Sequence, residues 1–229
     1  MDRALERLMV KLATRRSRRL RPARRRGKVD LRRSLRDALR HDGELLRLAR
    51  RDRRIDRPRL VLLCDVSGSM ERYSRFLLRF ILTACREPDV ETFVFSTRLT
   101  RLGPWLPRAD ADRVLARLGA RIQDWSGGTR IGASLSAFLD EYGRRMLGQR
   151  TVVIVLSDGL DQGEVEPLER AMRGIHRKAR KVIWLNPLLE SPDYRPEARG
   201  MKAALPYVDE FASGHSLEAL RELTALVRL

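Results

Sequence analysis

The stretch Asp65-Val66-Ser67-Gly68-Ser69 follows directly on the apolar run Leu60-Val61-Leu62-Leu63-Cys64, and the two together decide the fold. The apolar run has the length and the unbroken hydrophobicity of a strand that is buried on both faces. It breaks into a loop that carries one carboxylate and two hydroxyls at alternate positions. In open α/β sheets, ligands bind beyond the carboxyl ends of the strands, so this junction is a candidate site.

Strand and helix patterns alternate along the chain after residue 58. This order predicts an α/β fold with a doubly wound, mostly parallel sheet and helices on both faces. The segment 187–206 contains four prolines, which predict an irregular excursion. The expected strands are 60–64, 91–95, 98–102, 151–156, 182–185 and 208–211; the expected helices are 73–86, 110–118, 131–142, 165–179 and 217–227.

The positive charge is concentrated at the N-terminus. Residues 1–57 hold 22 Lys/Arg and 8 Asp/Glu, a net charge of +14 out of +18 for the whole chain. Such blocks of like charge repel one another, so we predict a partly disordered, Arg-rich N-terminal extension over 1–57 and a folded domain over 58–229. Within the extension we expect a short helix over 30–39, with Asp30 as its N-cap. Residues 46–50 fit a strand or a helix, and we favour an edge strand.

Composition excludes several classes of protein. No apolar segment approaches the roughly 20 residues of a membrane span, and the basic N-terminus lacks the apolar stretch of a signal peptide. The only cysteines, Cys64 and Cys85, indicate no disulfide framework. Cys64 and Trp184 lie in apolar strand patterns and are expected in the core. We therefore expect a cytoplasmic protein.

Two later segments carry the same oxygen chemistry as the first loop. They are Ser126-Gly127-Gly128-Thr129 and Ser157-Asp158-Gly159, the second of them directly after the apolar run 151–156. Oxygen ligands suit Mg²⁺ or Mn²⁺ better than zinc or copper, and glycines let the backbone turn tightly around an ion. The predicted metal ligands, bound directly or through water, are Asp65, Ser67, Ser69, Thr129 and Asp158.

A site with few carboxylate ligands would leave its metal electrophilic, so that it binds a carboxylate from outside. That favours a protein-binding function over a catalytic one, and we expect no enzyme. Alternatively, these same residues only cap helices and shape turns. The three histidines, His41, His176 and His215, are scattered and have no metal-ligand spacing.

At these residues the chain resembles the von Willebrand factor A (VWA) fold. Residues 65–69, Thr129 and Asp158 match its metal-ion-dependent adhesion motif, abbreviated MIDAS, in order and type. The segments 124–132, 183–188 and 200–206 look like CoxE-type proteins, and the resemblance extends back to residue 30. Members of that family usually carry a longer N-terminal helical region than the short Arg-rich segment found here.

The resemblance implies a cytoplasmic accessory protein. It would work with a MoxR-type AAA+ ATPase in the maturation of a molybdenum-containing carbon monoxide dehydrogenase or a related enzyme. An acidic side chain of the ATPase or of the client enzyme would complete the metal site.

Two other functions are open. In a haloacid-dehalogenase-like phosphatase, Asp65 would be the nucleophile, Ser126 or Thr129 a phosphate ligand and Asp158 a Mg²⁺ ligand. Against it, Ser67 stands where that family has a second aspartate, and no lysine occurs between Lys28 and Lys178.

Alternatively, the Arg-rich N-terminus makes the chain a nucleic-acid-binding scaffold. That segment has no interleaved aromatic residues, which favours either an acidic protein surface as its partner or no specific ligand. Near the metal loop, Trp125 either contacts a partner or packs the loop. Arg130 either binds an incoming carboxylate or is simply solvated.

Overall fold

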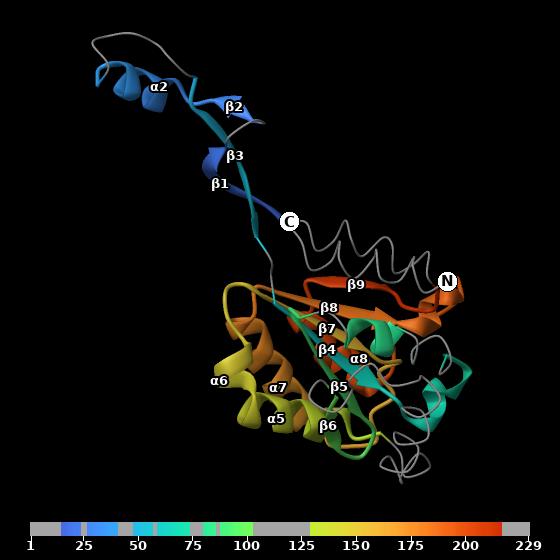
Figure 1. The fold of residues 1–229 in the computed structure, drawn as a ribbon. Helices are drawn as coiled ribbons and strands as arrows, with labels where there is room; N and C mark the ends of the chain where they lie inside the picture. The colour runs from blue at the N-terminus through green and yellow to red at the C-terminus, as the bar shows by residue number, and fades with distance from the viewer. Residues whose placement is uncertain are drawn as a thin grey trace. The chain divides into compact units, whose positions relative to one another are not determined.

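The chain folds into two compact units, one within Thr14–Arg57 and a larger one in the rest of the chain. A computed structural model of the protein is shown in Figure 1. The residues that it describes are 15–23, 27–40, 48–56, 59–73, 80–85, 88–102 and 129–216.

The larger unit is built on a six-stranded sheet in the order β6-β5-β4-β7-β8-β9 (Figure 1). Only β5 and β6 pair antiparallel, and every other neighbouring pair is parallel. Strands β4 and β7 lie at the centre, where their apolar runs are buried on both faces as the sequence predicts. The strands are β4 (Arg59–Asp65), β5 (Val90–Phe95), β6 (Leu99–Arg101), β7 (Thr151–Leu156), β8 (Lys181–Asn186) and β9 (Glu210–Ser213).

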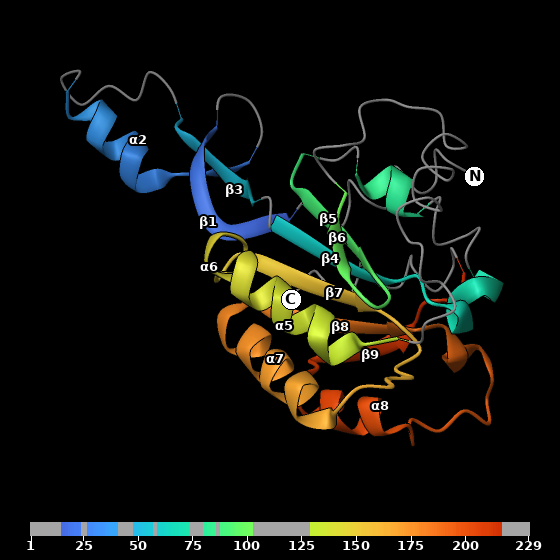
Figure 2. The same ribbon diagram turned by 90° about the horizontal axis from the view of Figure 1, so that it is seen from below.

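Helices cover both faces of this sheet, because successive side chains of a strand point to opposite sides. Leu60, Leu62 and Cys64 of β4 pack in one core with the helical residues 80–84. Val61 and Leu63 pack in the other core with α5, α7 and α8, and Figure 2 shows α5 and α7 side by side on this face. Cys64 and Trp184 are both buried, which confirms them as core residues.

The other elements of the larger unit are helical. Within the part of the chain that the structure describes, no helix has the length and hydropathy that a membrane crossing requires. Besides the helical residues 80–84, the helical elements whose bounds are described are η1 (Gly68–Tyr73), α5 (Ile131–Glu141), α6 (Gly143–Met146), α7 (Val165–Lys178), η3 (Pro187–Glu190), α8 (Arg199–Ala204) and η4 (Leu205–Tyr207).

The structure corrects two expected elements. The segment 187–206 is not irregular throughout, because α8 forms between its prolines, where Met201 and Ala204 are fully buried. The last strand begins at Glu210 rather than at 208, and it pairs with β8 from Ile183 to Asn186. The expected helices 110–118 and 217–227, and residues 74–79 and 86 of the expected helix 73–86, lie outside the described residues.

The smaller unit contains a three-stranded antiparallel sheet in the order β1-β3-β2, formed by Arg15–Ala23, Arg50–Asp56 and Lys28–Val29 respectively. Charge alone predicted no strand over 15–23. Across β1 and β3, Arg21 faces Asp52, and opposite charges stabilise a cross-strand pair. The strand expected over 46–50 begins only at Arg50.

Helix α2 (Leu31–Ala38) confirms the predicted short helix. Asp30 caps it, with its Oδ1 accepting a hydrogen bond from the Arg33 amide at 3.3 Å. The Ser34 hydroxyl donates to the Asp30 carbonyl at 2.9 Å and accepts from the Ala49 amide at 2.9 Å. These bonds tie the buried side of α2 to the segment that leads into β3.

A glycine substitution tests the contact between α5 and α7. A β-carbon on Gly132 would lie 2.7 Å from the Leu168 backbone nitrogen, so Gly132→Ala must push the two helices apart. We expect the free energy of unfolding to fall by about 1–3 kcal/mol in urea denaturation. Gly148→Ala is the control, because a β-carbon there would meet nothing within 4 Å. Equal stability of the two variants would contradict this packing.

Candidate metal centre

The loop after β4 folds back on the end of its own strand. Asp65 is the last residue of β4 and is fully buried, and its Oδ1 accepts a hydrogen bond from the Ser67 amide at 3.0 Å. The Ser67 and Ser69 hydroxyl oxygens lie 3.2 Å apart and share a hydrogen bond. The structure therefore brings the first three predicted ligands together within five residues of chain.

The loop after β7 is bonded directly to Asp65. The Ser157 hydroxyl donates to Asp65 Oδ2 at 2.6 Å and accepts from the Gly159 amide at 3.0 Å. The strand register brings them together, because Cys64 faces Leu156 across β4 and β7 and the next residues are Asp65 and Ser157. Sequence analysis named the segment 157–159 but missed Ser157 as the partner of Asp65, although the pairing of the two apolar runs could have signalled it.

Asp158, the residue after Ser157, is buried and is held by hydrogen bonds to both its backbone and its side chain. Its carbonyl accepts a hydrogen bond from Asn186 Nδ2 at 3.0 Å, and its Oδ1 accepts from the Leu160 amide at 3.0 Å. Asn186 also bonds the Tyr194 hydroxyl at 2.9 Å, which links Asp158 to the segment after β8. The next residue, Gly159, has φ +79°, a left-handed conformation that favours glycine.

Thr129 is buried just before α5 and is joined to the same loop through its main chain. Its carbonyl accepts a hydrogen bond from the Gln162 amide at 2.9 Å. The Asp161 carboxylate accepts from the Ile131 amide at 3.0 Å and from the Gly132 amide at 3.3 Å, so it caps α5 from another segment. Among the described residues, no hydrogen bond joins the Thr129 side chain to the other four predicted ligands.

Sequence analysis missed Asp161, which lies three residues beyond Asp158. Because its carboxylate bonds an element 29 and 30 residues earlier, no local pattern marks it. It holds the start of α5, and with it Thr129, against the loop that carries Asp158.

The electrostatics of the centre favour a cation. Burial raises the pKa of Asp65 to about 6, opposed by the hydrogen bonds from Ser157 and Ser67 and reinforced by nearby Asp158. Two buried carboxylates are thus close enough to repel each other, and a bound cation would relieve both penalties. In the described part of the chain, no three His, Cys, Asp or Glu side chains are grouped to hold a metal. The available donors are therefore two carboxylates with hydroxyls, which fit Mg²⁺ or Mn²⁺.

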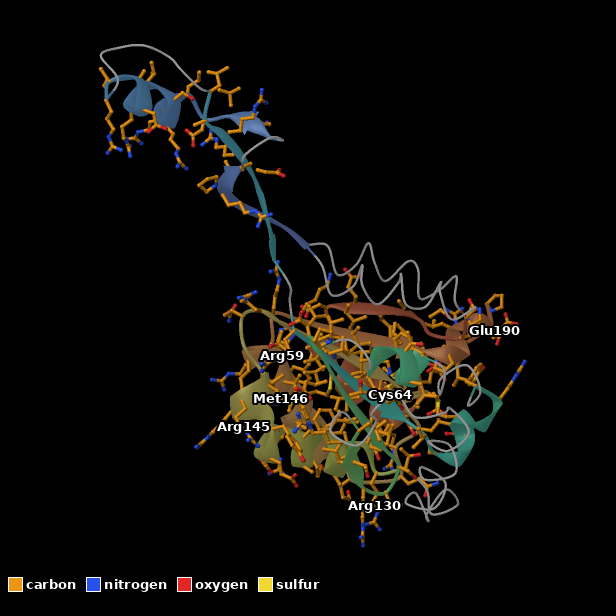
Figure 3. The ribbon with its side chains drawn as sticks, viewed as in Figure 1. Arg59, Cys64, Arg130, Arg145, Met146 and Glu190 are labelled. Carbon is orange, nitrogen blue, oxygen red and sulfur yellow. The ribbon has the colours of Figure 1, made fainter. Side chains whose placement is uncertain are left out.

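Other residues singled out from the sequence lie apart from these contacts. Arg130 is exposed, and Figure 3 shows its side chain extending into solvent. His176 lies 3.8 Å from the Asp209 carboxylate, and His215 bonds the Ser213 hydroxyl, so each has a surface or structural partner. Trp125, His41 and residues 126–128 lie outside the described residues.

A match with a family model shows which protein family the chain belongs to. The family model for "VWA domain containing CoxE-like protein" matches residues 1–220. The chain belongs to this family. The match confirms the VWA and CoxE-like resemblance, and it extends over the smaller unit of this CoxE-like protein as well as over the sheet. A comparison with curated proteins gives no match.

Solved structures with similar folds are distant from the CoxE-like chain. An aerotolerance-related membrane protein from Bacteroides fragilis has 16% identity and a TM-score of 0.45, over 73% of this chain and 96% of that one. Proximal thread matrix protein 1 from the mussel byssus has 17% identity and a TM-score of 0.42, over 73% of this chain and 46% of its own. Another structure of the mussel protein, described as having a zinc-occupied MIDAS motif, has 16% identity and a TM-score of 0.42, over 74% of this chain and 46% of its own.

Removing the Asp161 carboxylate tests its role as a cap. In Asp161→Ala, the amides of Ile131 and Gly132 lose their acceptor, and we expect the free energy of unfolding to fall by about 1–2 kcal/mol. Hydrogen exchange should show faster exchange at these two amides. Asp193→Ala, at an exposed position, serves as the control. Unchanged protection of both amides would show that Asp161 does not hold α5.

Proposed function

We propose that this CoxE-like protein is a metal-dependent protein-binding adaptor and not an enzyme. The observation that carries the proposal is the hydrogen-bonded group of Asp65, Ser67 and Ser69, joined through Ser157 to the loop of Asp158. Ser67, Ser69 and Thr129 would hold Mg²⁺ or Mn²⁺ through hydroxyls, and Asp65 and Asp158 would bind it directly or through water. The bound ion would act as a Lewis acid with an open position for a partner's Asp or Glu carboxylate.

The surroundings of Asp65 favour binding over phosphatase chemistry. A nucleophilic carboxylate must reach its substrate, whereas Asp65 has no exposed surface. Both of its oxygens already accept hydrogen bonds, from the Ser67 amide and from the Ser157 hydroxyl. Ser67 also occupies the position at which that phosphatase family has its second aspartate. Asp65 is therefore better placed to set the charge and shape of a metal site.

The partner that we propose is the one implied by the resemblance to CoxE-type proteins. The carboxylate that completes the site would belong to a MoxR-type AAA+ ATPase or to its client, a molybdenum-containing carbon monoxide dehydrogenase or a related enzyme. In this scheme the ATPase remodels the client in the cytoplasm, and the CoxE-like protein recognises the client through its metal.

Metal binding should stabilise the fold. After treatment with EDTA and dialysis, added Mg²⁺ or Mn²⁺ should raise the melting temperature, since a ligand at a hundred times its Kd stabilises the native state by about 2.7 kcal/mol. Asp65→Asn keeps the shape of the side chain but removes its charge, so this shift should disappear.

Asp140→Asn is the matched control for that experiment, because Asp140 is exposed on α5. It should respond to metal as the native protein does. The metal-site assignment would be wrong if Asp65→Asn and Asp140→Asn showed the same shift as the native protein.

Partner capture should depend on the same residues. Immobilised protein should retain the MoxR-type ATPase or the client in Mg²⁺ and release it in EDTA, because the partner's carboxylate would lose its metal. Asp158→Asn should retain little partner in either buffer, whereas Asp140→Asn should retain the native amount. Equal recovery by all three proteins with and without EDTA would rule out a metal-bridged complex.

A further inference from the structure

We propose that helix α2 of the smaller unit is a docking surface for an acidic amphipathic helix of a partner protein. The surface, here named the α2 surface, consists of two rows: Leu31, Leu35 and Leu39, and Arg32, Arg36 and Arg40. It contains none of the metal-centre residues. Docking at the α2 surface can therefore be tested independently of metal binding.

The leucine row is exposed although it is apolar. Leu31, Leu35 and Leu39 have 67%, 59% and 80% of their surface accessible. The helix is buried through Ser34 and Ala38 instead, and Ser34 bridges Asp30 and Ala49 by hydrogen bonds. A helix normally turns its large apolar side chains to the core, and an exposed apolar row marks an interaction site.

The arginine row runs parallel to the leucine row. Arg32 and Arg36 each follow a leucine of α2 by one residue, which places them about 100° further around the helix. Leu39 and Arg40 repeat this pattern directly after the last helical residue, Ala38. Among the described residues, Arg32, Arg36 and Arg40 form no ion pair, while neighbouring Arg33 lies 3.9 Å from Asp37. The same arginines line a pocket together with Asp30, Arg33, Asp37 and Arg51.

The charge of the whole unit identifies the sign of the partner. Thr14–Arg57 contains 19 Lys/Arg and 6 Asp/Glu, a net charge of +13. Unpaired guanidinium groups bind carboxylates well, because their planar donors match both carboxylate oxygens. The surface therefore requires an anionic partner that also covers three leucines.

A helix satisfies both requirements at once. Residues four apart repeat about every 6 Å along a helix, so a partner with leucines at i, i+4 and i+8 and glutamates beside them matches the pitch of both rows. Nucleic acid would pair with the arginines and leave the leucines exposed. A continuous anionic surface would also repel Asp30 and Asp37, which line the pocket, whereas a protein helix can present a basic side chain to them.

Fluorescence anisotropy with the full chain tests the proposal. The probe is a labelled synthetic helix with leucine and glutamate rows of this spacing, compared with a scrambled peptide of the same composition. We expect the patterned peptide to bind at least about tenfold more tightly than the scrambled one, and added salt to weaken binding. The α2 variants, each of which should weaken binding about tenfold or more, are Arg32→Gln/Arg36→Gln/Arg40→Gln and Leu31→Ser/Leu35→Ser/Leu39→Ser.

The control removes the same charge from exposed positions of the larger unit, and its affinity should stay within about twofold of the native value. It is Arg144→Gln/Arg145→Gln/Arg177→Gln. A charge swap gives a test that does not depend on a triple variant folding. Arg36→Glu should lower the affinity for the patterned peptide. A second peptide, with arginine in place of the glutamate that faces residue 36, should restore the affinity of this variant.

Several results would overturn the proposal. Equal affinity for the scrambled peptide, or no effect of the leucine variant, would reduce the surface to unspecific charge. Tighter binding to duplex DNA or to anionic vesicles than to the patterned peptide would assign it to another class of partner. Self-association that is lost only in the leucine variant would identify a second copy of the chain as the occupant.

Discussion

The hydrogen bond from the Ser157 hydroxyl to Asp65 Oδ2 is the contact on which the candidate metal centre depends. It exists because β4 and β7 are adjacent parallel strands whose apolar runs end at the same level of the sheet. Burying a charged carboxylate such as Asp65 costs desolvation free energy. The hydrogen bonds from the Ser157 hydroxyl and the Ser67 amide offset part of that cost. The remaining cost is the physical reason why a bound cation would be favoured at this edge.

Much of the fold was predictable, because it follows from apolar runs that are buried on both faces. The strands 60–64 and 151–156 and the helix 165–179 agree with β4, β7 and α7 to within a residue or two. The positions of the candidate ligands Asp65, Ser67 and Asp158 were also predictable, since each stands where such a strand ends. The hydrogen bonds around these residues could not be predicted from the sequence, because Asp161 and Asn186 bond to residues far away along the chain.

The errors have physical causes of their own. Four prolines in 187–206 suggested an irregular segment, yet residues 201–204 include two that are fully buried and sustain a helix. Like charge over 15–23 gave no sign of a strand there, yet Arg21 of β1 faces Asp52 of β3 across the register. In both cases a tertiary contact outweighs a local preference.

The two residues of the Ser157–Asp65 bond are 92 positions apart along the chain. Contacts of such long range form late, because the entropy of closing so large a loop must be overcome first. The carboxylates and hydroxyls of the centre are therefore scattered in a nascent or damaged chain and meet only when the central strands pair. The proposed cation binding would thus report completed folding, so an adaptor built in this way would recruit its partner only after its own sheet has closed.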